Sequence, residues 1–158
     1  MKLSHLAALS FSLATLNCMA QTEPQQLGIE EKAVLDMAAL ACKQDQQAAV
    51  GAIALRDKGK TKEELSKPLP PRGPDNNRLA KLMYEILDDI YGYPEIKEFP
   101  YYVFRSEMCF RSAQGLSNPS GFPVIARKAL ECQTTHGAAQ SHELINCIRG
   151  VVIKGIGK

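Results

Sequence analysis

The chain has 158 residues, with 19 lysines and arginines, 17 aspartates and glutamates, and a formal net charge of +2. This near balance argues against a general nucleic-acid-binding protein, because such proteins need a clustered positive field. No segment beyond the N-terminal region is apolar over about eighteen residues, so we expect no membrane span.

The first twenty residues have the layout of a cleaved secretory signal peptide. Lys2 gives a positive start, an apolar run covers residues 6–16, and Cys18 and Ala20 stand at −3 and −1 of a cut before Gln21. A lipoprotein anchored through Cys18 is the weaker alternative, because the residues before it lack the expected leucine and small residue. We therefore predict a signal peptide over 1–20 and a single helical domain over 21–158, periplasmic or secreted.

Residues 30–58 are rich in good helix formers and predict a first long helix that ends at Gly59. Cys42 falls on its inward stripe, which suits a buried crosslink. Thr61 and Glu64 have the spacing of a capping box and predict a short second helix. The proline-rich residues 67–77 follow as a stiff connector.

The strongest amphipathic pattern covers residues 76–92 and predicts a helix that ends at Gly92. Apolar side chains recur at helical spacing on one face, and charged side chains occupy the other, where we expect Asp88 and Asp89 to be solvated. The expected apolar face consists of Leu79, Leu82, Met83, Ile86, Leu87 and Ile90.

Three further helices are predicted in the last third of the chain. Pro100 suits the first turn of one through Gln114, Pro123 suits the first turn of the next, and Ser141 caps the last. No segment alternates convincingly between apolar and polar residues, as a half-buried strand would. The predicted fold is all-α, a single irregular bundle of five or six helices held by two disulfides.

Four cysteines remain after the leader is removed, and an even number in an exported chain favours disulfides over free thiols. Cys132 and Cys147 lie on two predicted helices joined by a short turn, so we expect their sulfurs to tie a helical hairpin. Cys42 is then left to pair with Cys109 by elimination.

The alternative for the same stretch is a metal- or ligand-binding site. Cys132, His136, His142 and Cys147 are all residue types that bind zinc. Cys132 and His136 could share a helix face, but the other two align poorly and Gly137 breaks the helix between the pairs. The disulfide is the favoured interpretation, with a zinc site as its rival.

Eight of the nine aromatic residues after the leader lie between Tyr84 and Phe110. Several of these rings must supply core volume, as a cap over one end of the bundle. The functional alternative is a contact surface for another protein, because tyrosines beside a proline-stiffened loop suit recognition. The candidate partner-binding residues are Tyr91, Tyr93, Tyr101 and Tyr102.

No complete catalytic set is found, and we expect no cofactor. The stretch beginning at His142 reads H-E-x-x-N, with Asn146 where a zinc protease needs its second histidine. In signal peptide, size, helices and paired cysteines, the chain resembles the small exported immunity proteins that neutralise cell-wall-directed toxins of bacterial competitors. The resemblance is one of architecture and assigns no site residue.

These features predict a non-enzymatic module that binds another protein, in an inhibitor, immunity or chaperone-like role. A metal or ligand carrier using the Cys132–Cys147 region is the alternative. A small hydrolase without an identifiable catalytic set is the third possibility.

Overall fold

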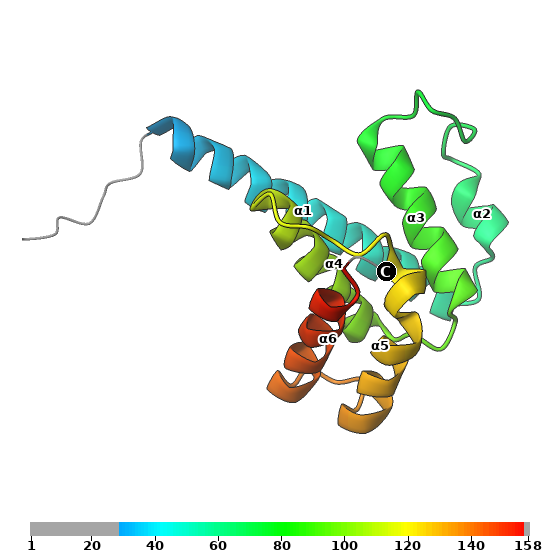
Figure 1. Ribbon diagram of the computed structural model, residues 1–158. Coiled ribbons are helices and arrows are strands. Elements are labelled where there is room, and N and C mark those ends of the chain that lie inside the picture. The colour runs from blue at the N-terminus through cyan, green and yellow to red at the C-terminus, as the bar shows by residue number, and fades with distance from the viewer. Residues whose placement is uncertain (1–28, 157–158) are drawn as a thin grey trace, which may run out of the picture.

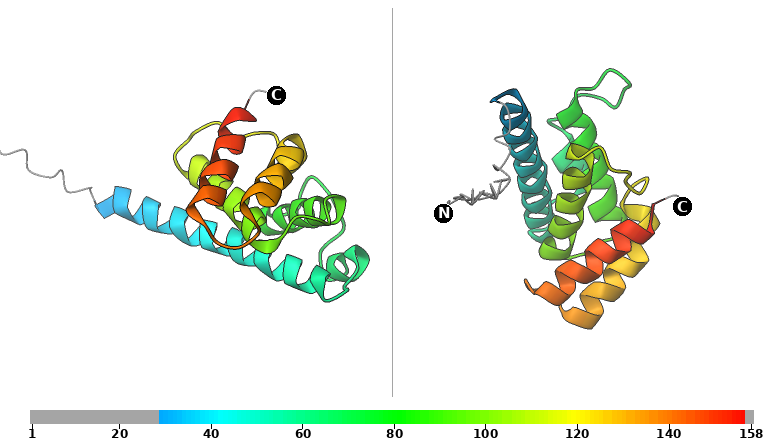
Figure 2. Two further views of the ribbon diagram at one scale, coloured as in Figure 1. Left: turned by 90° about the horizontal axis from the view of Figure 1, so that it is seen from below. Right: turned by 60° about the vertical axis from the view of Figure 1, so that its left-hand side comes forward.

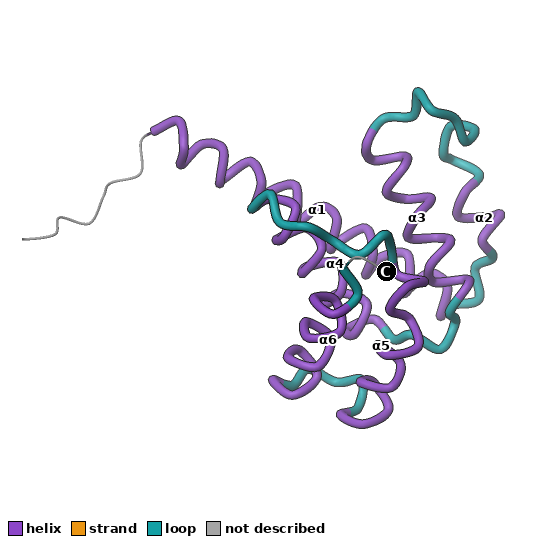
Figure 3. Tube along the Cα trace, in the orientation of Figure 1, coloured by secondary structure: helices purple, strands orange, loops and turns teal. Residues whose placement is uncertain are grey.

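The computed structural model describes residues 29–156 and, within them, contains six helices and no strand (Figures 1 and 3). The predicted all-α class is therefore confirmed. The predicted signal peptide over residues 1–20 lies outside the described residues. The helices are α1 (Ile29–Asp57), α2 (Lys62–Ser66), α3 (Arg78–Gly92), α4 (Glu98–Ala113), α5 (Phe122–His136) and α6 (His142–Lys154).

The longest helix, α1, packs against α4, and the two run in opposite directions. Near the C-terminal end of α1, the guanidinium of Arg56 donates to the carbonyl oxygens of Ile90 and Ile96, at 3.1 and 2.9 Å. Further towards its N-terminus, α1 is bonded through Cys42 to Cys109 in the second half of α4. The first turns of α1 extend beyond the other helices (Figure 2), so this end of the helix stands clear of the bundle.

Helices α5 and α6 form a hairpin against α4 (Figure 1). Gly137 ends α5 with a φ of 80°, a left-handed conformation that glycine adopts without a Cβ clash. The Ser141 hydroxyl accepts a hydrogen bond from the Leu144 amide at 3.1 Å and so caps α6. The predicted break at Gly137 and the predicted cap at Ser141 are both confirmed.

The core is built around an aromatic cluster where α4 meets α5. Tyr101, Phe104 and Phe122 are fully buried, with ring centroids between 5.0 and 5.8 Å apart. The rings therefore supply the core volume that the alanine-rich α1 lacks. The largest buried aliphatic side chains around them are Ile53, Ile86, Leu87, Ile90, Ile96, Ile125, Leu144, Ile148 and Val152.

Local capping rules decide how α2 and α3 begin. The Thr61 hydroxyl accepts from the Glu64 amide, while the Glu64 carboxylate accepts from the Thr61 amide, which completes the predicted capping box. The Asn77 side chain accepts from the amide of Ala80 at 2.9 Å and caps α3. Both helices begin where the sequence predicts.

Two positions on α3 differ from the sequence prediction. Leu79 was expected in the core but is exposed. Asp89 was expected in solvent but is buried. Periodicity identifies the face of a helix, but it does not show how far the neighbouring helices cover that face.

Candidate functional site

The cysteine- and histidine-rich stretch forms a crosslinked turn. Cys132 and Cys147 are bonded across the α5–α6 hairpin, with Cα atoms 5.8 Å apart, so neither sulfur is a thiolate that could bind zinc. His136 ends α5 and His142 begins α6, and both are exposed. Among residues 36–156, no group of three or more His, Cys, Asp or Glu side chains is placed to hold a metal ion.

The pairing of Cys42 with Cys109, predicted by elimination, is also confirmed. Their Cα atoms are 5.5 Å apart and their separation in sequence is 67 residues. The bond ties α1 to α4 near the point where α1 leaves the bundle. Two disulfides in a chain of this size are consistent with an oxidising compartment.

For Tyr101, one of the four candidate partner-binding tyrosines, the prediction of a partner contact is wrong. Its ring is 0% exposed and packs edge-on against Phe122, so it cannot contact a partner. Its hydroxyl donates a hydrogen bond to the Asp89 carboxylate at 2.7 Å. Tyr101 was expected to flank a proline-containing loop at the start of a helix and to face a partner, but on α4 it faces inward.

The other three tyrosines are half-buried and largely face their own protein. The Tyr91 hydroxyl donates to the carbonyl oxygen of Lys60, and the Tyr93 ring meets Phe122 edge-on at 5.4 Å. The Tyr102 ring stacks on Phe99, with centroids 6.0 Å apart. Contact of these three rings with a partner stays a prediction.

Asp89 is the centre of a buried polar cluster between α3 and α4. Burial raises the pKa of Asp89 from 3.8 to about 6, while the hydrogen bond from Tyr101 and the positive charge of Arg105 oppose the rise. Burial also raises the pKa of the Tyr101 hydroxyl, so Tyr101 stays protonated and keeps donating to Asp89. The pKa values of the two adjacent carboxylates therefore shift in opposite directions. Asp88 pairs with Arg72 and Lys62 at the surface, which lowers its pKa.

The face of α1 turned away from the bundle is apolar and exposed. Met37, Leu40 and Leu55 expose 64%, 58% and 42% of their surface, and they share this face at helical spacing. The predicted inward face of this helix does not include these three residues, and their apolar side chains outside that face are the signal in the sequence for a second, exposed apolar face. Among the exposed residues between 36 and 55, the uncharged ones are Met37, Ala39, Leu40, Gln44, Gln47, Gly51 and Leu55, and the charged ones are Asp36 and Lys43.

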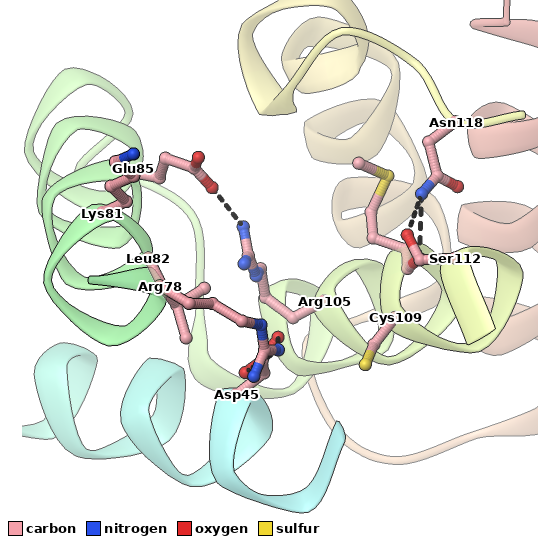
Figure 4. Close-up of a pocket in the computed structure, with 10 residues that line it drawn as sticks. Asp45, Arg78, Lys81, Leu82, Glu85, Arg105, Cys109, Ser112 and Asn118 are labelled. Carbon is pink, nitrogen blue, oxygen red and sulfur yellow. Dashed lines mark hydrogen bonds and ion pairs between the residues drawn. The ribbon is translucent and has the colours of Figure 1, made fainter. Parts of the chain in front are cut away.

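A polar cavity of about 520 Å³ lies on another side of the molecule, where α1, α3 and α4 meet (Figure 4). No sequence motif pointed to it, because its residues come from three helices and the loop after α4 and converge only on folding. It is lined by Asp45, Arg78, Lys81, Leu82, Glu85, Arg105, Met108, Cys109, Ser112 and Asn118.

A second depression, of about 460 Å³, lies between α1, α4 and α6 beside Cys42 and is lined mainly by apolar atoms. The exposed ring of Phe110 forms part of its edge. At its base, the buried carboxylate of Glu107 pairs with Arg149 at 3.2 Å and Arg111 at 3.9 Å. In addition to the exposed apolar side chains on the outward face of α1, Phe110 is thus exposed on the side of α1 that faces α4.

No helix in the described part of the chain is long and apolar enough to cross a bilayer. A scan against protein-family models found no match, and searches of curated proteins and of solved structures found no significant match. The assignment of a function therefore depends on the geometry of the chain itself.

Proposed function

We propose that this protein is an exported, non-enzymatic module that binds another protein along the outward face of α1. The observation that carries the proposal is the exposed, uncharged surface from Met37 to Leu55. Large apolar side chains that are exposed on one face, here Met37, Leu40 and Leu55, can mark interaction sites in soluble proteins. The face extends over about 27 Å, at 1.5 Å per residue, which is long enough to receive a helix of the partner.

Rigidity supports the same role. The Cys42–Cys109 bond fixes α1 to α4 near the Met37 end of the proposed surface, on the opposite side of the helix, so binding need not order this helix first. Asp36 and Lys43 would supply a charged rim.

Export supplies the setting. The two disulfides are consistent with an oxidising environment, and the predicted leader would deliver the chain to the periplasm or the medium. In that setting a small binding module would serve as an inhibitor, an immunity protein or a chaperone. The zinc-carrier alternative loses its thiolates to the Cys132–Cys147 bond.

Photo-crosslinking in the producing cells tests the proposal. A photoreactive residue at position 40 or 55 should give one discrete adduct with a partner, whereas the same residue at Lys128, exposed on α5, should give none. Leu40→Glu should abolish the adduct formed at position 55, because it places an unpaired charge in the interface. Lys128→Glu is the matched control.

Leu40→Glu should leave the free energy of unfolding within about 0.5 kcal/mol of wild type, because Leu40 is 58% exposed. Thermal unfolding of the purified variant checks this, so that a lost adduct reports lost binding. Equal adducts at positions 40 and 128, or no adduct at 40 and 55, would contradict the proposed surface.

A further inference from the structure

The polar cavity between α1, α3 and α4 contains an arginine with an unmet hydrogen bond. Arg105 is 8% exposed, and its Nε atom is buried with no hydrogen-bond partner among the described residues. Its closest carboxylate oxygen in an ion pair is Glu85 Oε2, 3.7 Å from Nη1, which is too long for a hydrogen bond. A buried N–H donor of a guanidinium that has no acceptor lowers the stability of the folded state.

The same cavity contains a buried acceptor without a donor. Asn118 donates through Nδ2 to the carbonyl oxygen of Met108 at 2.9 Å and to the Ser112 hydroxyl at 2.7 Å. These bonds fix the amide, and its Oδ1 atom is buried with no partner. Within residues 36–156, whose side chains the structure describes, Arg105 Nε and Asn118 Oδ1 are the two buried side-chain atoms left unpaired, and both residues line this one cavity.

The balance of charge in the lining favours an anion. Both carboxylate oxygens of the buried Asp45 lie 2.8 Å from Arg78 Nη2, so this pair neutralises itself. Among the lining residues, Lys81 and Arg105 then remain against the single carboxylate of Glu85, whose side chain is mostly exposed. The charge of Arg105 also acts on Asp89, which does not line the cavity. A carboxylate suits a guanidinium especially well, because its two oxygens match the geometry of the arginine donors.

The spacing of the two unpaired atoms favours an extended ligand. Arg105 and Ser112, to which Asn118 is bonded, lie seven residues apart on α4, a rise of about 10 Å along the helix. Arginine side chains on a helix lean towards its N-terminus, away from Ser112. Figure 4 shows Arg105 directed towards Glu85 of α3 and Asn118 beyond Ser112 on the other side of the lining.

We propose that this cavity binds the C-terminal carboxylate of an extended peptide. The carboxylate would accept from Arg105 Nε and pair with Lys81, while the backbone N–H of the third residue from the C-terminus would donate to Asn118 Oδ1. Because both atoms are covered in the unbound protein, the side chains over them would have to move on binding. A cavity of about 520 Å³ has room for such a segment. The inference does not rest on the proposed function, since the cavity and the outward face of α1 share no residue.

Titration of the purified full-length mature protein tests the proposal with three probes. Acetyl-trialanine carries the carboxylate and the N–H groups, its C-terminal amide lacks the charge, and N-acetyl-alanine is a short acid. Calorimetry should give an affinity at least about tenfold higher for acetyl-trialanine than for its amide, as expected for a charged hydrogen bond. N-acetyl-alanine should bind more weakly than acetyl-trialanine, because it cannot reach both atoms.

Two variants and one control locate the site. Arg105→Met should weaken acetyl-trialanine binding about tenfold, Lys81→Met should weaken it less, and Lys128→Met, with the same change in net charge on α5, should have no effect. In wild type, the Nε–H signal of Arg105 in an NMR spectrum should shift on titration. If Arg105→Met fails to fold, Lys81→Met and the amide probe still test whether the cavity recognises a carboxylate.

Three outcomes would overturn the proposal. Absence of binding at millimolar acetyl-trialanine would mean that water alone satisfies the two atoms. Equal binding of the acid and its amide would exclude carboxylate recognition. Equal binding of N-acetyl-alanine and acetyl-trialanine would exclude an extended ligand and point to a small acid.

Discussion

Replacing Cys42 and Cys109 with alanine is expected to lower the free energy of unfolding by about 4 kcal/mol. The bond closes a loop with a sequence separation of 67 residues, and in the chain-entropy model the stabilisation grows with the length of the closed loop. Without the bond, the unfolded chain regains that freedom. We also expect the projecting half of α1 to exchange its amide hydrogens faster, because the crosslink ties it to α4.

Replacing Cys132 and Cys147 with alanine is the matched control, with an expected loss of about 3 kcal/mol for a separation of 15 residues. Urea unfolding under non-reducing conditions measures both losses. The intact mass before and after reduction should change by four hydrogens, as two disulfides require. A larger loss for the short loop than for the long one, or an unchanged mass, would contradict the prediction.

Stability is expected to depend on pH through Asp89. Because burial raises the pKa of Asp89 from 3.8 to about 6, the folded state binds a proton more tightly than the unfolded state between these values. The contribution of Asp89 is therefore most favourable when it is protonated, at about pH 4 and below. It declines as the pH rises to about 6, by on the order of 3 kcal/mol in total.

Asp89→Asn isolates this effect, because asparagine is uncharged at every pH and can still accept from Tyr101. Between about pH 4 and pH 7, the free energy of unfolding of the variant should rise relative to wild type by on the order of 3 kcal/mol. The neighbouring charges act in both directions, since Arg105 lowers the pKa of Asp89 while Glu85 and Asp88 raise it.

Chemical denaturation of wild type and variant across this pH range measures the difference. Asp88→Asn is the control, because Asp88 pairs with Arg72 and Lys62 at the surface and its pKa is lowered, so its effect should have the opposite sign and be small. Parallel pH profiles for wild type and Asp89→Asn would show that Asp89 does not titrate as a buried acid.

Local sequence rules predicted the helices well. The capping box at Thr61 and Glu64, the cap at Ser141 and the stop at Gly137 each depend on atoms within a few residues, so a single chain segment contains the whole cause. The disulfide pairing followed from a short loop and elimination. The caps and stops are independent of how the helices pack against one another, whereas each disulfide joins two helices and therefore also requires that they meet.

The assignments that required packing were less successful. Tyr101 and Asp89 belong to segments predicted as a contact surface and a solvated face, yet they bond to each other in the core. Leu79 sits in the apolar pattern but remains exposed. Whether such a side chain is covered depends on residues 12 or more positions away, which periodicity along one helix does not register.

The sequence by itself determined that this chain is helical and where most of its helices begin and end, because propensity, capping and periodicity act over a few residues. It also indicated that four cysteines would pair. Only the tertiary structure decided which surfaces are free and which polar groups are left unpaired. The cavity at Arg105 exists because α1, α3 and α4 pack against one another, and the outward face of α1 is exposed because those helices pack on its other side. Burial and charge balance depend on this packing.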